Sequence, residues 1–165
     1  LYGLDLHSNQ IKHIEKHQFI SCIRLIRLDL SYNEIEYFEP EAFFKMGSLE
    51  ILNLKNNEIK SVFDSLFVGA ERLRQIDLSN NQISSIENKT FNKLTRLAEL
   101  KLNSNKIRNL DVEPFRSLTL LFNLDLSIND LRISITPYQF NGLARLDDLN
   151  IENNNIKIIL NNTFN

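Results

Sequence analysis

The sequence predicts an α/β-type solenoid, a fold in which short parallel strands stack one coil on the next. The first observation is a segment of the form LxxLxLxxNxL, with Ile allowed for Leu, that occurs seven times. The second is its spacing, which is 24 residues between successive copies and 25 before the last copy. The third is a phenylalanine that follows the asparagine of every copy by ten or eleven residues. One copy is too small to bury its apolar face, so neighbouring copies must supply the core.

Each copy begins with a predicted strand. Apolar and polar residues alternate around its second and third leucines, as they do in a short strand with one buried face. Stacked copies would pair as a parallel sheet with about 4.8 Å between strands. We expect the strands to begin near Leu4, Leu28, Leu52, Ile76, Leu100, Leu124 and Leu149.

The asparagine and the phenylalanine each have a physical reason to recur. The asparagine lies where the chain turns away from the strand, and its amide can bond backbone groups of its own turn and of the neighbouring turn. The phenylalanine column fills the wider outer side of the coil, where we expect buried rings stacked one beside another. These rings are Phe19, Phe43, Phe67, Phe91, Phe115, Phe140 and Phe164.

This pattern resembles the leucine-rich repeat family in its 24-residue form, LxxLxLxxNxLxxLxxxxFxxLxx, which is common in animal extracellular proteins. The resemblance covers residues 1–165, and the mild departures are Cys22, Met46 and Ala70 at a late leucine position. The family implies a right-handed horseshoe, with the strands on the concave face and irregular turns on the convex face.

We expect residues 1–165 to form one domain of seven repeats that is part of a longer array. Leu1 opens within a strand motif, and Asn165 follows a core phenylalanine by one residue. Neither end shows the cysteine cluster that flanks many extracellular members of the family. Open ends of solenoids expose core side chains, so the sequence predicts further repeats or capping segments on at least one side.

Several functions are not expected. A net charge of −2 gives no basic field for nucleic acid or anionic lipid, and no apolar run is long enough to insert into a membrane. His7, His13 and His17 fall on different faces of one coil, which does not suit a metal site. The sequence has no phosphate-binding loop, nucleophile elbow or metal motif. We therefore expect no catalytic residues, no cofactor and no metal.

Function in a solenoid lies in the exposed columns. The residues between the two strand leucines should face the concave side, and they include Asp29, Asp77 and Asp125. Acids outnumber bases there and in the two flanking columns. This excess is either the ordinary filling of the motif or a ligand-binding strip. The candidate ligand-binding residues are Asp29, Ile51, Asp77, Glu99, Lys101, Phe122 and Asp125.

Basic residues gather along both borders of this strip. The border after the strands holds Lys12, Glu36, Lys60, Ser84, Arg108, Arg132 and Lys157, and the border before them holds Arg24, Ser48, Arg72, Arg96, Leu120 and Arg145. These charges either pair with one another at little energetic value or orient a charged partner. Apolar residues in otherwise polar columns are candidate anchors: Phe122 could form one patch with Ile128, and Ile26 another with Tyr32.

Two N-glycosylation sequons begin at Asn88 and Asn161, each seven residues past the asparagine of its repeat. That register places both on the convex side, clear of the concave face. We therefore expect an extracellular or cell-surface glycoprotein.

The resemblance to animal receptors and arthropod immune proteins implies a non-enzymatic recognition module of a receptor, innate-immune or adhesion protein. The expected partner is a protein with a basic surface, or a microbial or glycan ligand, bound on the concave face. Two alternatives remain open. One is a cytoplasmic leucine-rich-repeat adaptor whose sequons are not used, and the other is a matrix protein that self-associates.

Overall fold

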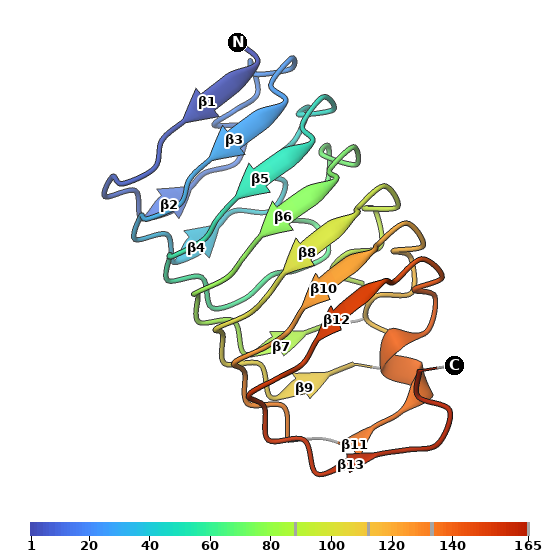
Figure 1. The fold of residues 1–165 in the computed structure, drawn as a ribbon. Helices are drawn as coiled ribbons and strands as arrows, with labels where there is room; N and C mark the ends of the chain where they lie inside the picture. The colour runs from blue at the N-terminus through green and yellow to red at the C-terminus, as the bar shows by residue number, and fades with distance from the viewer. Residues whose placement is uncertain (88, 112, 133, 165) are drawn as a thin grey trace.

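The computed structural model describes residues 1–87, 89–111, 113–132 and 134–164. Seven strands form one parallel sheet, in chain order, on one face of the solenoid (Figure 1). We call it the concave sheet. Each strand starts one residue before the predicted leucine or isoleucine, so the expected repeats are confirmed. The strands are β1 (Gly3–Asp5), β3 (Arg27–Asp29), β5 (Ile51–Asn53), β6 (Gln75–Asp77), β8 (Glu99–Lys101), β10 (Asn123–Asp125) and β12 (Asp148–Asn150).

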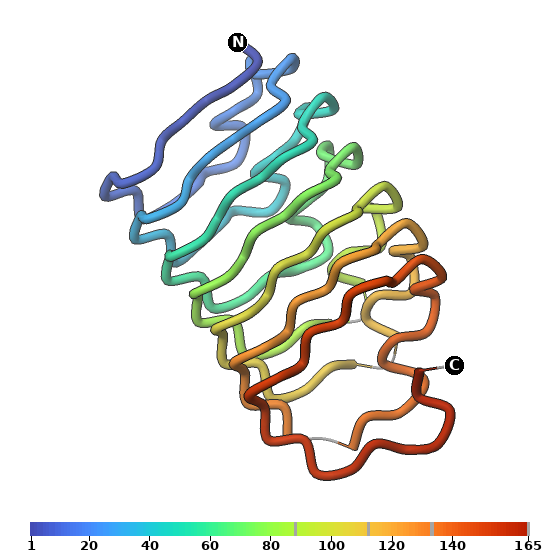
Figure 2. The backbone as a smooth tube through the Cα atoms, viewed as in Figure 1, coloured from blue at the N-terminus to red at the C-terminus, as the bar shows by residue number. Residues whose placement is uncertain are grey.

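The register of the concave sheet follows the sequence repeat. Equivalent residues pair between neighbouring strands: Leu4 lies opposite Leu28, Leu28 opposite Leu52, and Leu52 opposite Ile76. The backbone trace shows the coils stacked in parallel along the whole chain (Figure 2). Each column of the aligned sequence is therefore a row of side chains across the sheet.

Convex strands are shorter, with two residues each, and they pair locally. The pairs are β2 (His13–Ile14) with β4 (Tyr37–Phe38), β7 (Ser85–Ile86) with β9 (Asn109–Leu110), and β11 (Ser134–Ile135) with β13 (Ile158–Ile159). The 25-residue repeat contains a 3-10 helix, η1 (Pro137–Phe140). Its amino end is capped by Thr136, whose hydroxyl accepts the Tyr138 N–H at 3.3 Å. A single tight helical turn thus accommodates the extra residue.

The leucine and phenylalanine columns form one continuous core. Phe43, Phe67 and Phe91 are fully buried, and successive rings stack with centroids 6.3 Å and 6.0 Å apart. The expectation of seven buried rings is wrong at one position. Phe164 is 57% exposed, because it stacks on Phe140 on one side and no described coil covers its other side.

The repeated asparagine forms the predicted ladder. The Asn81 amide donates to the carbonyl of Leu78 in its own coil at 3.1 Å and to the carbonyl of Leu54 in the preceding coil at 2.9 Å. Its Oδ1 accepts the backbone N–H of Ile59 at 3.0 Å. The same contacts recur in successive coils, so a buried polar side chain satisfies backbone groups that no strand can pair.

Close packing of the convex turns explains one glycine. Gly142 has φ +90°, and a Cβ on it would lie 2.3 Å from the carbonyl oxygen of Arg116 in the preceding coil. No larger side chain fits there without moving the neighbouring backbone.

Candidate functional site

The concave sheet brings five of the seven predicted ligand-binding residues together in two adjoining hollows. The first, of about 180 Å³, is lined by Ile51, Asp77, Glu99 and Lys101 from β5, β6 and β8. The second, of about 310 Å³, lies over β1, β3 and β5 and is lined by Asp29 and again by Ile51. Ile51 therefore lines both hollows and contributes an apolar side chain beside charged ones.

Lys101 lies between two acidic residues. The register places it opposite Asp77 on one side and opposite Asp125 on the other. Among the described residues, neither carboxylate approaches the lysine ammonium closely enough to form an ion pair. The three side chains therefore present a negative–positive–negative row across β6, β8 and β10.

The aspartates of this row also have a structural role. In Asp77, one carboxylate oxygen accepts both the N–H and the hydroxyl of Ser79, at 2.9 Å and 2.5 Å. Asp125 binds Ser127 in the same way. An aspartate two residues before a serine is a local turn signal that the sequence already carries. The acidic column thus partly reflects turn chemistry, while Oδ2 of Asp77 and of Asp125 accepts no hydrogen bond from any described residue.

Asp29 differs from these two because both of its oxygens are used. Oδ1 accepts from Ser31, and Oδ2 accepts the amide of Asn53 at 2.9 Å. Partial burial acts to raise the pKa of Asp29, but the hydrogen bonds from Ser31 and Asn53 together outweigh it and leave the pKa below its ordinary value. Asp29 is therefore held ionised and oriented at the edge of the second hollow.

The apolar anchor candidates flank the sheet instead of forming patches within one repeat. Phe122 is 39% exposed and directly precedes β10, whereas Ile128 is 51% exposed and follows the strand. The strand separates them, so they lie on opposite borders of the concave sheet. Ile26 and Tyr32 lie on either side of β3 in the same way.

Tyr32 and Ile128 share a backbone feature that was not evident from their side chains. Their φ angles are +53° and +52°, in the left-handed region. The same turn position in the other repeats is filled by Ser8, Asn56, Asn80, Ser104 and Asn153. The recurrence of asparagine and serine at this position is the sequence signal that indicates a left-handed turn.

The two basic borders differ in their ion pairs. On the border after the strands, Lys12 pairs with Glu34 at 3.4 Å, and Lys60 pairs with Glu36 at 2.7 Å. The remaining pairs on that border join Arg108 and Arg132 to a shared carboxylate, that of Asp130, at 3.3 Å and 2.8 Å. On the border before the strands, Arg24, Arg72, Arg96 and Arg145 form no ion pair with any described residue. The simpler explanation, mutual pairing, therefore fits one border only.

The histidines near the amino-terminal end make separate contacts. His7 contacts Ser8, and His17 packs near the ring of Phe44. No group of three or more metal-ligating side chains gathers within the described part of the chain. No helix among the described residues is long and apolar enough to cross a bilayer.

One of the two sequons can be described. Asn161 is exposed on the convex side, as expected. Its partner Thr163 is buried and donates its hydroxyl to the carbonyl of Leu160 at 2.6 Å. Asn88 lies outside the described residues, although Thr90 of the same sequon is buried at the equivalent position. Burial alone is thus a sufficient reason for a threonine at both of these positions.

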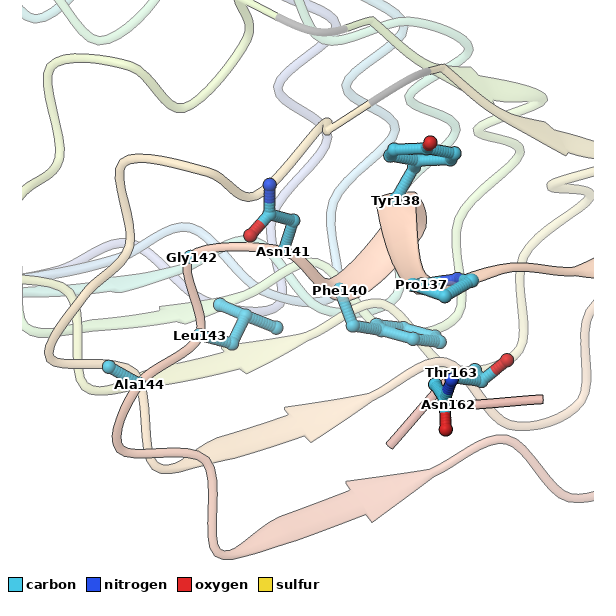
Figure 3. A pocket seen from close by; sticks show the side chains of 9 residues that line it. All are labelled: Pro137, Tyr138, Phe140, Asn141, Gly142, Leu143, Ala144, Asn162 and Thr163. Atoms are coloured by element: carbon cyan, nitrogen blue, oxygen red, sulfur yellow. The ribbon is translucent and has the colours of Figure 1, made fainter. Parts of the chain in front are cut away.

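A further pocket lies on the convex side of the last two coils. It has a volume of about 540 Å³ and is bounded by η1, the turn at Gly142 and the segment at Asn162 and Thr163 (Figure 3). Its lining holds no charged side chain.

Two of the comparisons with known proteins give matches. A leucine rich repeat family model matches residues 1–59, 47–107, 71–131 and 95–156. A solved chain in the crystal structure of a TLR13–ssRNA13 complex is similar with a TM-score of 0.66 and 29% sequence identity. The match covers 88% of the present chain and 24% of that chain, so the present chain spans about a quarter of its length. No curated protein sequence gives a significant match.

Proposed function

The chain belongs to the leucine-rich repeat family, and on that premise we propose that it is a non-enzymatic recognition module of a secreted or cell-surface receptor, innate-immune or adhesion protein. The observation that carries this proposal is the concave sheet. Its inward rows repeat the same leucines, while its outward rows differ from coil to coil. A rigid frame with variable outward positions is the arrangement that repeat proteins use to bind partners.

The ligand of the concave sheet is a protein that presents basic groups. Asp77, with its free carboxylate oxygen, lines the first hollow, and Glu99 lines it as a second acid. Asp125, with its own free oxygen, lies on the neighbouring strand β10. Ile51 supplies an apolar contact at the centre, and Phe122 supplies one at the margin. Charged groups at such a surface steer encounter, and apolar anchors prolong the complex.

The exposed sequon asparagine Asn161 supports this face and an extracellular location. A glycan is bulky and hydrated, so one on Asn161 would cover convex turns and leave the concave sheet open. The solved neighbour was crystallised with a single-stranded RNA, as its title states. The acidic rows of the present concave sheet repel phosphates, so we do not extend nucleic-acid binding to this face.

Binding kinetics test the face. A panel of secreted proteins and microbial glycans is screened against the wild-type chain, and each hit is remeasured with Asp77→Lys plus Asp125→Lys. This variant should slow association and weaken its salt dependence, because rim charges act on the encounter rate. Phe122→Ala should mainly speed dissociation.

The matched control reverses two exposed convex acids, Asp64→Lys with Glu87→Lys, which changes the net charge by the same amount. It should leave the association rate near that of the wild type. Loss of binding in this control, with none in the concave variant, would place the ligand on the convex side instead.

The alternatives are separated by expression and by size. Production through a secretory pathway should add a glycan mass that is lost when both sequons are removed in Asn88→Gln with Asn161→Gln, and a chain secreted without any glycan would favour the cytoplasmic adaptor. Light scattering over a concentration series should give a constant mass. A mass that rises with concentration would favour the self-associating matrix protein.

A further inference from the structure

The border before the strands is a row of identical turns. In each repeat, a backbone N–H bonds the carbonyl three residues earlier, as from Leu73 to Ala70 at 3.1 Å and from Leu97 to Leu94 at 2.9 Å. The two residues between donor and acceptor form the tip of the turn. Six such tips occur, and we call them together the turn ridge: 23–24, 47–48, 71–72, 95–96, 119–120 and 144–145.

The turn ridge is held rigidly. Two residues beyond each tip, backbone bonds join one coil to the next, as from Arg74 to Glu50 at 2.8 Å and from Ala98 to Arg74 at 2.8 Å. These bonds fix the spacing between successive tips at that of neighbouring strands, about 4.8 Å. The tips therefore follow one another in a regular row along one flank of the solenoid (Figure 1).

The charge of the turn ridge is opposite to that of the whole chain. Its twelve residues include four arginines and one glutamate, whereas the chain carries a net charge of −2. All four arginines are exposed, and none pairs with a described carboxylate. The single acid, Glu71, accepts the backbone N–H of Gly69 at 3.0 Å. The concentrated positive charge is thus available to an external anion.

We propose that the turn ridge binds a linear anionic glycan, whose sulfate or carboxylate groups are held by Arg24, Arg72, Arg96 and Arg145. Guanidinium groups bind such anions through paired N–H donors. Arg72 and Arg96 lie on adjacent coils and form the centre of the site. A single-stranded nucleic acid is less suited, because its bases stack on aromatic side chains and none of the twelve ridge residues is aromatic. The site is separate from the concave sheet and does not depend on the protein ligand proposed there.

The test uses a size-defined heparin oligosaccharide labelled with a fluorophore, and it measures Kd by anisotropy over a series of salt concentrations. Arg72→Gln with Arg96→Gln should weaken binding about tenfold, because two charge-assisted contacts are lost. It should also reduce the dependence of Kd on salt, since fewer counterions are released. A hyaluronan oligosaccharide of equal length carries carboxylates without sulfate, so comparing its Kd with that of heparin shows which anionic group the turn ridge prefers. Binding of either glycan through the turn ridge supports the proposal.

The matched control is Arg108→Gln with Arg132→Gln. It also removes two arginines from adjacent coils, but on the border where both pair with Asp130. Binding by the control should stay within about twofold of the wild type, because the Asp130 carboxylate beside both guanidinium groups repels a second anion. Asp77→Lys with Asp125→Lys should not weaken glycan binding, which separates this site from the concave one.

Three results would overturn the proposal. The first is unchanged glycan affinity in the ridge variant. The second is an equal loss in the Arg108 and Arg132 control, which would mean attraction by overall charge. The third is tighter binding of a single-stranded RNA of equal charge that is lost in the ridge variant, which would identify a nucleic acid as the occupant.

Discussion

Replacing Phe91 with alanine tests whether the stacked rings hold the coils together. Phe91 is fully buried, and its ring centroid lies 6.0 Å from that of Phe67 and 6.2 Å from that of Phe115. Phe164 occupies the same position of its repeat, but it is 57% exposed and stacks on Phe140. The two positions share their chemistry and differ in burial, so Phe164→Ala is a matched comparison.

The expected losses follow from burial and ring contacts. Phe91→Ala removes a fully buried aromatic and leaves a cavity, which costs about 3–5 kcal/mol in a packed core. At Phe164 less than half of the side chain is buried, so the transfer contribution falls to about 1 kcal/mol. The single remaining ring pair adds about 0.5–1.5 kcal/mol. The free energy of unfolding should therefore fall about twice as far in Phe91→Ala as in Phe164→Ala.

Urea denaturation followed by far-UV circular dichroism measures both variants. The slope of the free energy against urea must match the wild type for the comparison to hold, because solenoids can unfold in parts. Equal losses at the two positions, or a loss below about 1 kcal/mol at Phe91, would show that the ring column is not the main support of the convex side.

Three further changes probe the ladder, a convex turn and the acidic strip. Asn81→Leu leaves the Ile59 N–H and two carbonyls without their partner. The free energy of unfolding, measured in urea, should therefore fall by about 3 kcal/mol or more. A fall near zero would exclude the asparagine ladder as a support of the fold. Gly142→Ala should lower the free energy of unfolding by about 1–3 kcal/mol, because of its positive φ and the contact with Arg116, whereas Gly47→Ala, with open space around its Cβ, should not. Asp29 has a lowered pKa in the folded chain, so the unfolded chain takes up its proton at higher pH. Its contribution to stability is present above its ordinary pKa and is lost as the pH falls through the lower folded value, so Asp29→Asn should reduce the acid dependence of the urea midpoint.

The fold was predictable because each structural role is repeated in the sequence. Seven copies of the same offsets located every strand of the concave sheet to within one residue. The exposure of Phe164 was not predictable from its column, since a ring is buried only when coils lie on both sides of it. The repeat predicts what a coil offers its neighbours, and the number of neighbours decides what is buried.

The candidate site was predictable in its rows but not in its charge pairing. Strand alternation was enough to place Ile51, Glu99 and Lys101 on one face. Which border arginines are neutralised depends on side chains from neighbouring coils, as when Arg108 reaches Asp130 of the next coil, 22 residues later in the chain. Arg108 and Asp130 occupy different positions of the repeat, so comparing equivalent positions of successive repeats does not reveal their ion pair.

The backbone at Ile128 links the fold to its proposed use. The turn after each strand requires a positive φ, which asparagine and serine adopt at this position in neighbouring repeats. A left-handed conformation costs an ordinary residue about 1–2 kcal/mol, and a β-branched side chain makes it less favourable still. Ile128 is 51% exposed, so burial offsets at most part of that cost. Local stability therefore does not account for isoleucine at this turn. An apolar side chain held outward on a rigid, strained turn is well suited to contact a partner at the border of the concave sheet.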